Sequence, residues 1–165
     1  MKKVFLTLFA ACMVFAASAQ ISQGTILVGA SSNAGFTSYN EDAGDYSQFN
    51  IDLKGGYFVI DNLALGLNLG YTKIDDASQT TFGAFGRYYV NGKIFGGIGF
   101  NSTSVDLGGS DATVSTIPIE VGYAAFINDA IAVEPALSYS IFGGDAEGAA
   151  FGLNIGLTLY LGRGE

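Results

Sequence analysis

Five charged residues stand inside runs of alternating sequence, where their neighbours are mostly apolar or small. They are Asp52, Lys54, Arg87, Glu120 and Glu134. In most of these runs the charged residue takes the parity of the glycines, alanines and amides, while most large apolar side chains take the other parity. A charge held away from water needs a partner of opposite sign, or it becomes neutral. The chemistry that these residues predict is therefore ion pairing within an interior.

The positions of these charges along their runs predict which of them meet. Counted from the nearest tight turn, Arg87 and Glu134 lie at similar heights. The same holds for Lys54 and Glu120, whereas Asp52 lies one step farther from its turn. Two interpretations remain open: a static plug that fixes strand register, and a gate whose ion pairs exchange. The plug is favoured, because a barrel of eight strands is normally filled by side chains.

Catalytic chemistry finds little support in the sequence. The chain contains no histidine, which removes the Ser-His and His-Asp dyads that many hydrolases use. Serine and threonine are plentiful, but none has a visible activating base. We therefore expect no enzymatic activity, no cofactor, and neither a catalytic nor a metal site.

Nine of the fifteen acidic residues gather in four polar connections. Carboxylate oxygens suit divalent cations such as calcium, but EF-hand spacing is missing. A solvated, self-repelling surface is the favoured interpretation of such clusters. The four connections read NAGFTSYNEDAGDY, KIDDASQ, VDLGGSD and GGDAEG.

Period-two alternation predicts eight strands. The segment LALGLNLGY, residues 63–71, has leucine at every second position up to Leu69, with only Ala, Gly and Asn between. Tight turns at Asp61-Asn62, Asn91-Gly92 and Asn128-Asp129 alternate with the four longer connections. The predicted strands cover residues 23–32, 47–59, 63–72, 80–90, 93–104, 113–127, 130–141 and 148–161.

The direction of the apolar face follows from the size of the barrel. Eight strands enclose a lumen just wide enough for side chains, so rows of leucine and isoleucine would overfill it. The apolar face must therefore point outward, where only lipid suits so continuous a surface. The predicted fold is all-β, an eight-stranded antiparallel up-and-down transmembrane β-barrel.

Aromatic and proline residues add two local expectations. Pro118 and Pro135 fall inside predicted strands, where we expect a bulge or local widening. Aromatic residues near strand ends predict belts at the lipid headgroups. The belt at the tight-turn end would contain Tyr57, Phe58, Tyr88, Tyr89, Phe126 and Tyr160, and the other belt Tyr71, Phe100 and Tyr139.

The N-terminal residues predict secretion. Lys2 and Lys3 precede an apolar run that ends at Ala17-Ser18-Ala19, which is typical of a cleavable signal peptide over residues 1–19. Residues 20–165 would form the barrel. Lipidation at Cys12 is an alternative, but the apolar run continues beyond this residue. The net charge of −8 disfavours nucleic acid as a partner.

With this pattern, the chain resembles the small outer-membrane β-barrel families of Gram-negative bacteria, the OmpA/OmpX/OmpW-like group described as outer membrane protein β-barrel domain or porin-family protein. The last strand carries the most specific likeness. Asn154, Gly156, Leu159 and Leu161 match the C-terminal insertion signal polar-x-Gly-x-x-hydrophobic-x-hydrophobic. The family prefers aromatic residues at the final positions, where this chain has leucines followed by GRGE.

The resemblance implies a monomer in the outer membrane, with both termini in the periplasm and the long loops extracellular. It implies contact with membrane lipid and lipopolysaccharide, and recognition of the last strand by the barrel-assembly machinery. A structural or surface-interaction role, with the lumen plugged by the charge cluster, is the favoured function. A narrow passive pore for small or hydrophobic solutes is one alternative, and a soluble lipocalin-like ligand-binding barrel is another.

Overall fold

The computed structural model describes residues 20–31, 35–41, 44–74, 77–106, 111–145 and 147–163, so the predicted signal peptide lies outside the described residues. No helix among them is long and apolar enough to cross a bilayer. Side chains are described for these residues with the exception of 31–48 and 111. The strands are β1 (Ile26–Ser31), β2 (Gly35–Glu41), β3 (Gly44–Ile60), β4 (Leu63–Ile74), β5 (Ala77–Val90), β6 (Ile94–Asp106), β7 (Asp111–Tyr123), β8 (Ala125–Phe126), β9 (Ile131–Gly144) and β10 (Gly148–Leu161).

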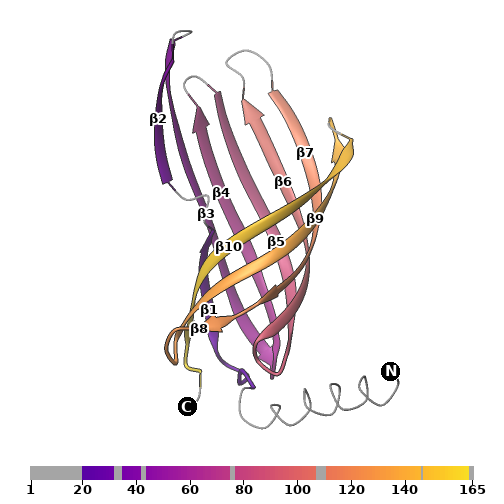
Figure 1. The fold of residues 1–165 in the computed structure, drawn as a ribbon. Helices are drawn as coiled ribbons and strands as arrows, with labels where there is room; N and C mark the ends of the chain where they lie inside the picture. The colour runs from indigo at the N-terminus through magenta and orange to yellow at the C-terminus, as the bar shows by residue number, and fades with distance from the viewer. Residues whose placement is uncertain are drawn as a thin grey trace, which may run out of the picture.

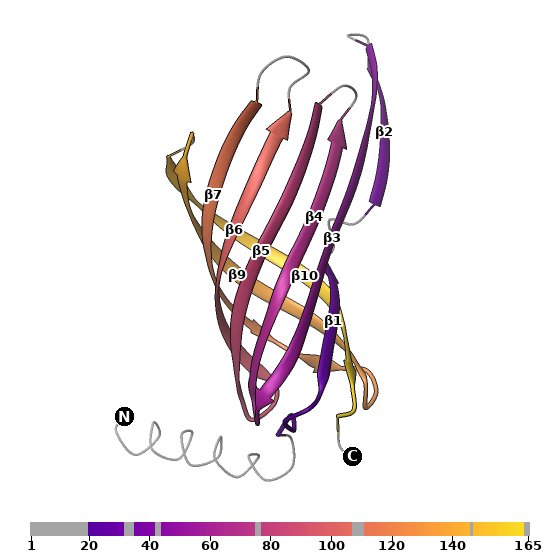
Figure 2. The same ribbon diagram turned by 180° about the vertical axis from the view of Figure 1, so that it is seen from behind.

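These strands occupy eight positions around a closed antiparallel barrel, as predicted (Figures 1 and 2). β1 and β2 share one position, because both pair with β3. β7 and β8 share another, because both pair with β9. The barrel closes where β1 pairs with β10, from Ile26↔Leu161 to Ser31↔Gly156. The start of β1 and the end of β10 lie at the same end as the tight turns (Figure 1).

The strands run farther toward the other end than the sequence predicted. Residues 33–46, expected as one long polar connection, contain β2 and the start of β3, which pair down to Glu41↔Gly44. The three remaining polar connections are shortened in the same way, for instance to residues 75 and 76 between β4 and β5. The prediction was wrong here because it equated polar sequence with loop. An antiparallel ladder satisfies its backbone groups whether its side chains are polar or apolar.

The tight turns follow the chemistry of their residues. Asn91 and Gly92 both have positive φ, 55° and 61°, as a type I′ turn requires. In the turn after β8, the Asn128 side chain accepts hydrogen bonds from the backbone N–H groups of Ala130 and Ile131, at 2.9 and 2.8 Å. These turns set the register of the strands that carry the inward charges.

The two prolines interrupt ladders without shifting the register. The β6–β7 ladder skips from Ile98↔Ile119 to Asn101↔Thr116, beside Pro118. The β7–β9 ladder ends at Gly122↔Ala136, next to Pro135, and pairing with β9 resumes in β8 at Ala125↔Val133. A proline lacks the N–H that its ladder needs. The expected local disturbance is therefore present, but the expected bulge is not. The register shift of the described ladders lies instead in the β3–β4 ladder, between Phe58 and Ile60.

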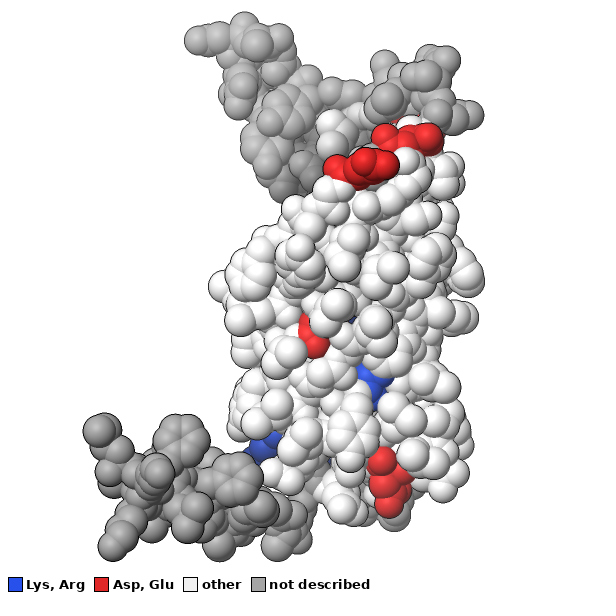
Figure 3. Space-filling model, turned by 90° about the vertical axis from the view of Figure 1, so that its right-hand side faces the viewer, with Lys and Arg blue, Asp and Glu red and all other residues white. Residues whose placement is uncertain are grey.

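The large apolar side chains point outward, as predicted. Leu65, Leu67 and Leu69 are each more than half exposed, at 51%, 52% and 56%. Figure 3 shows that the described surface between the two ends of the barrel is largely uncharged. A soluble lipocalin-like barrel needs this face inside around a ligand, so that alternative does not match the structure.

Candidate functional site in the barrel lumen

Arg87 on β5 lies at the centre of a buried ion-pair cluster. Its Nη1 donates to Glu134 Oε2 at 2.8 Å. Its Nη2 and Nε both donate to Glu120 Oε1, at 2.7 and 3.0 Å. The side chains of Arg87 and Glu134 are only 2% and 4% exposed. The planar fork of arginine suits this task, because it presents several donors in fixed directions.

The other two inward charges lie on β3 and are more loosely held. Lys54 Nζ lies 3.9 Å from Glu120 Oε2, and these side chains are 28% and 21% exposed. The Asp52 carboxylate lies beside Gly70 on β4. No ion pair joins Asp52 to a lysine or arginine of the described residues. The structure therefore brings four of the five predicted residues into one cluster and leaves Asp52 above it.

Glycine makes room for these long side chains. In one row across the wall, Arg87 pairs with Gly97, which pairs with Glu120. A Cβ atom on Gly97 would stand 2.9 Å from both Cγ and Oε1 of Glu120. The bond between Arg87 and Glu120 therefore depends on the residue between them being glycine. Sequence reasoning paired Arg87 with Glu134 alone, although the alternation of large and small residues across neighbouring strands carried the signal for Glu120.

Below the ion pairs, hydroxyl groups and aromatic rings form a buried lower lumen. Arg87 Nη1 donates to Tyr89 OH at 3.1 Å, and the hydroxyls of Tyr89 and Tyr160 lie 2.9 Å apart. Tyr160 OH donates in turn to Glu134 Oε1. The rings of Phe58 and Phe95 pack against Tyr89 with centroids 5.4 and 5.5 Å apart. All four aromatic side chains are at most 1% exposed.

This core corrects the predicted aromatic belt. Phe58, Tyr89 and Tyr160 were expected at the lipid headgroups, but they fill the lumen. Tyr57 and Tyr88 do point outward, with 49% and 54% exposure. The belt prediction relied on closeness to the turns and ignored parity. Tyr89 shares the inward parity of Arg87, which would have placed it correctly.

A short N-terminal segment, residues 20–25, covers the tight-turn end of this core. Ile21 is fully buried, and its backbone N–H and C=O bond to Asn62 Oδ1 and the Asn62 N–H at 3.0 and 2.9 Å. Gly24 N–H donates to the carbonyl of Phe58 at 2.9 Å. The sequence did not predict that this segment covers the core, because a strand was expected to begin at residue 23, whereas β1 begins at Ile26. The lower lumen is thus closed from beneath by the chain itself.

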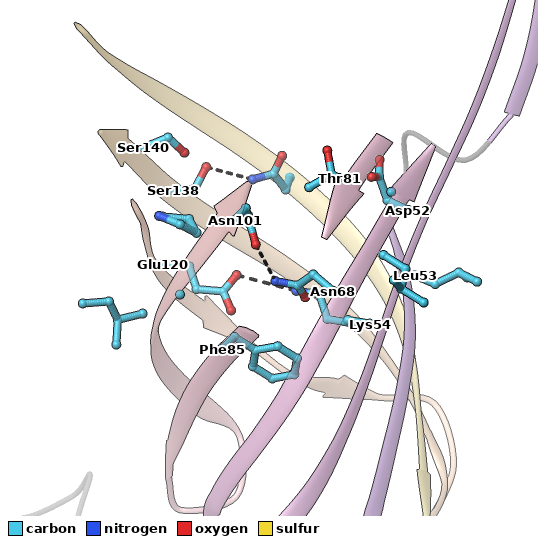
Figure 4. Close-up of a pocket in the computed structure, with 16 residues that line it drawn as sticks. Asp52, Leu53, Lys54, Asn68, Thr81, Phe85, Asn101, Glu120, Ser138 and Ser140 are labelled. Atoms are coloured by element: carbon cyan, nitrogen blue, oxygen red, sulfur yellow. Dashed lines mark hydrogen bonds and ion pairs between the residues drawn. The ribbon is translucent and has the colours of Figure 1, made fainter. Parts of the chain in front are cut away.

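Above the ion pairs, the lumen holds a polar cavity of about 290 Å³, here called the upper well (Figure 4). Its walls carry short neutral side chains that pair along the wall, between neighbouring strands or over one intervening strand. Asn68 Nδ2 donates to Asn101 Oδ1 at 3.1 Å, and Asn154 Nδ2 donates to Ser138 Oγ at 2.9 Å. Lys54, Phe85 and Glu120 line the well on the side of the ion pairs. A smaller cavity of about 200 Å³ lies against the cluster and shares Lys54, Glu120 and Asn154 with the well.

Metal chemistry is not apparent in the described part of the chain, which contains no group of three or more His, Cys, Asp or Glu side chains arranged to hold an ion. In the acidic connections, Asp145 Oδ2 accepts a backbone hydrogen bond from Thr113 at 2.8 Å. Of the predicted insertion signal, Asn154 reaches the lumen, while Leu159 and Leu161 pair with β1 near the C-terminal end. Its role as a signal stays a prediction.

No protein-family model and no curated protein matches the chain. Two solved structures are similar to it. One is the Neisserial surface protein A (NspA), at 19% identity and a TM-score of 0.49, covering 86% of this chain and 99% of that one. The other is the Yersinia pestis outer membrane protein Ail, at 12% identity and a TM-score of 0.52, covering 84% and 100%. The chain has the fold of a small outer-membrane β-barrel.

Proposed function

We propose that this protein is a non-conducting β-barrel of the Gram-negative outer membrane with a structural or surface-interaction role. Its fold, its exposed leucines and the closure of the barrel by β1 and β10 suit a bilayer, where strands must pair their backbone groups. The filled lower lumen carries the proposal. A barrel whose lumen is closed by side chains and by its own N-terminal segment offers no continuous path for solutes.

The energetics of the lower lumen favour a plug over a gate. To open a path, a solute would have to displace Arg87 from two carboxylates and separate rings that are almost fully buried. Breaking a buried ion pair leaves an uncompensated charge, which costs about 3–5 kcal/mol. The hydrogen bonds of Tyr160 to Glu134 and Tyr89 tie this ion pair to the aromatic core, so one part does not move without the other.

Planar bilayer recordings test this proposal. We expect no steady unitary current from the wild-type protein. The double variant Tyr89→Ala with Tyr160→Ala removes two rings from the plug and should produce intermittent currents. Leu65→Ala, on the outer face, is the matched control and should remain silent. A steady wild-type current would favour the narrow pore instead.

The proposed orientation has the tight turns and both termini in the periplasm and the long connections outside. Protease added to intact cells should then cleave within residues 33–46 and spare Asn91-Gly92. Cleavage at the tight turns alone would invert the orientation.

The proposed partners are membrane lipid, lipopolysaccharide and the barrel-assembly machinery, with the protein itself a monomer. Leu161→Asp changes the last position of the proposed insertion signal and should lower the amount of protein recovered in outer-membrane fractions. Ile127→Asp, on an exposed apolar residue near the same end, is the control for a general folding defect.

A further inference from the structure

We propose that the upper well is a binding site for a small organic ammonium compound that carries hydroxyl groups, with Asp52 as the residue that receives its charge. This inference goes beyond the proposed function, because a plug needs only the lower lumen. It rests on the shape of the well, its lining groups and its charge.

The well is a dead end that solvent reaches. Exposure changes sharply at its floor: Lys54 and Glu120 retain 28% and 21%, while Arg87 and Glu134 keep only 2% and 4%. Asn154, which lines the well, is also exposed. The β1–β10 ladder ends two residues away, at Ser31↔Gly156. A solute can therefore enter the well but cannot pass through the barrel.

The lining groups can surround a polar molecule with acceptors. In the pairs Asn68–Asn101 and Asn154–Ser138, the asparagine that donates uses its N–H. No hydrogen bond joins the side-chain oxygen of Asn68 or Asn154 to another described residue, so each can accept from a ligand. Thr81 adds a hydroxyl, which lies 2.8 Å from that of Thr103. Phe85 supplies an apolar surface beside these groups.

The charge of the lumen favours a cation. Of the five inward charges, three are carboxylates and two are cationic side chains. Arg87 is bonded to Glu134 and Glu120, and Lys54 lies nearest Glu120, so these carboxylates have partners. Asp52 lines the well higher up without an ion pair to a described residue. Away from bulk water, a charge attracts its counterion more strongly than at an open surface.

Local geometry shows that Asp52 is set into the well rather than left at its edge. Asp52, Gly70 and Thr81 form one row across β3, β4 and β5. A Cβ atom on Gly70 would stand 2.5 Å from Asp52 Oδ1 and 3.2 Å from Thr81 Cβ. The missing side chain of Gly70 therefore lets the Asp52 carboxylate lie over Gly70, on the side of Thr81. An ammonium group and a neighbouring hydroxyl match these two partners.

The volume sets the size of the compound. At about 30 Å³ for each water in the liquid, 290 Å³ corresponds to on the order of ten water molecules. A monosaccharide-sized amine fits this space. An anion would face the carboxylates of Asp52 and Glu120 with Lys54 as the one cationic side chain among the lining residues, and Lys54 already lies nearest Glu120, which disfavours phosphate and carboxylate compounds.

Calorimetric titration of the refolded protein in detergent micelles tests the proposal with two probes, D-glucosamine and D-glucose, which differ by one ammonium group in place of a hydroxyl. We expect glucosamine to bind with at least tenfold higher affinity than glucose. Asp52→Asn should reduce the affinity for glucosamine at least tenfold, to the level of glucose. Asp129→Asn removes an equal charge at the tight-turn end and should leave binding unchanged.

The proposal is overturned if neither probe binds, if both bind equally, or if Asp52→Asn and Asp129→Asn have the same effect. Thr81→Val provides a second variant that keeps every charge and the volume of the well, and it should weaken glucosamine binding by a smaller factor. Heat-dependent migration on gels establishes that each variant is folded. Because titration in micelles involves neither conductance nor orientation, a failure here would leave the proposed function standing.

Discussion

The lower and upper halves of the lumen are built on the same strands but are filled in opposite ways. The lower half holds four buried aromatic rings and an arginine bonded to two carboxylates. The upper half holds short hydroxyl and amide side chains around a cavity. One wall can therefore carry a dense plug and an open polar well, with the difference made by a few inward positions on each strand.

The largest expected effect is the loss of Arg87. Arg87→Ala leaves Glu134 buried without its partner and should lower the free energy of unfolding by about 3–5 kcal/mol. The double variant Arg87→Ala with Glu134→Ala should be less destabilised than the single variant, because the stranded charge is gone. Urea unfolding in lipid vesicles measures both. Losses that simply add would mean that the two side chains do not act as a pair.

The next largest effect distinguishes a residue on the outer face of the barrel from one that faces the lumen. Leu67 faces outward and Asn68 faces the upper well. Leu67→Arg should cost about 2–4 kcal/mol, as expected for a charge on the lipid face near the middle of the bilayer. Asn68→Arg can approach Asp52 and should cost less. Equal defects for both variants in refolding experiments would contradict the assignment of the two faces.

The removal of one hydroxyl group from each half of the lumen compares the two halves by the same chemical change. Tyr160→Phe removes a buried donor and leaves Glu134 Oε1 without it, so we expect a loss of about 1–3 kcal/mol. Ser138→Ala removes an acceptor from Asn154, which is exposed to water, and should cost about 0.5 kcal/mol. Urea unfolding measures both losses. Equal losses would contradict the difference in burial between the two halves of the lumen.

Lys54 should have the smallest effect. Its ammonium lies 3.9 Å from Glu120, which keeps two hydrogen bonds from Arg87 when the lysine is removed. Lys54→Gln should therefore lower the free energy of unfolding by about 0–1 kcal/mol, in the range of exposed ion pairs. A loss as large as that of Arg87→Ala would show that the Lys54 ammonium is held in an environment as buried as that of Arg87.

Much of the fold could be predicted because one physical rule, period-two alternation, applies to every strand. The rule placed Leu65 and Leu67 on the outer face. The errors arose where a second rule replaced it. Polar sequence was taken as loop at residues 33–46, and closeness to a turn was taken as a headgroup position for Tyr89. In both places the backbone ladder and the parity of the residue, rather than its chemical type, decided the outcome.

The lumen was harder to predict, because contacts across it join strands that the sequence does not place side by side. Charge marked the inward residues, and height along the strand suggested Arg87 with Glu134. The bond of Arg87 to Glu120 depends on Gly97 between them, and a single chain gives little weight to one glycine among twenty-four. Apart from Asp52, Lys54 and Glu120, the upper well carried no charge signal. Its neutral pairs, such as Asn68 with Asn101, become visible only once the strands are registered.

The pairing of β1 with β10 has a consequence for the order in which the chain folds. Most neighbouring strands are consecutive along the chain, but Ile26 pairs with Leu161, nearly the full length of the described chain away. Contacts between distant residues carry the largest entropic cost of closure and form slowly. The N-terminal segment, by contrast, bonds to the nearby turn at Asn62. Its docking can therefore precede the β1–β10 ladder, and we expect formation of this ladder to be the slow step in completing the barrel.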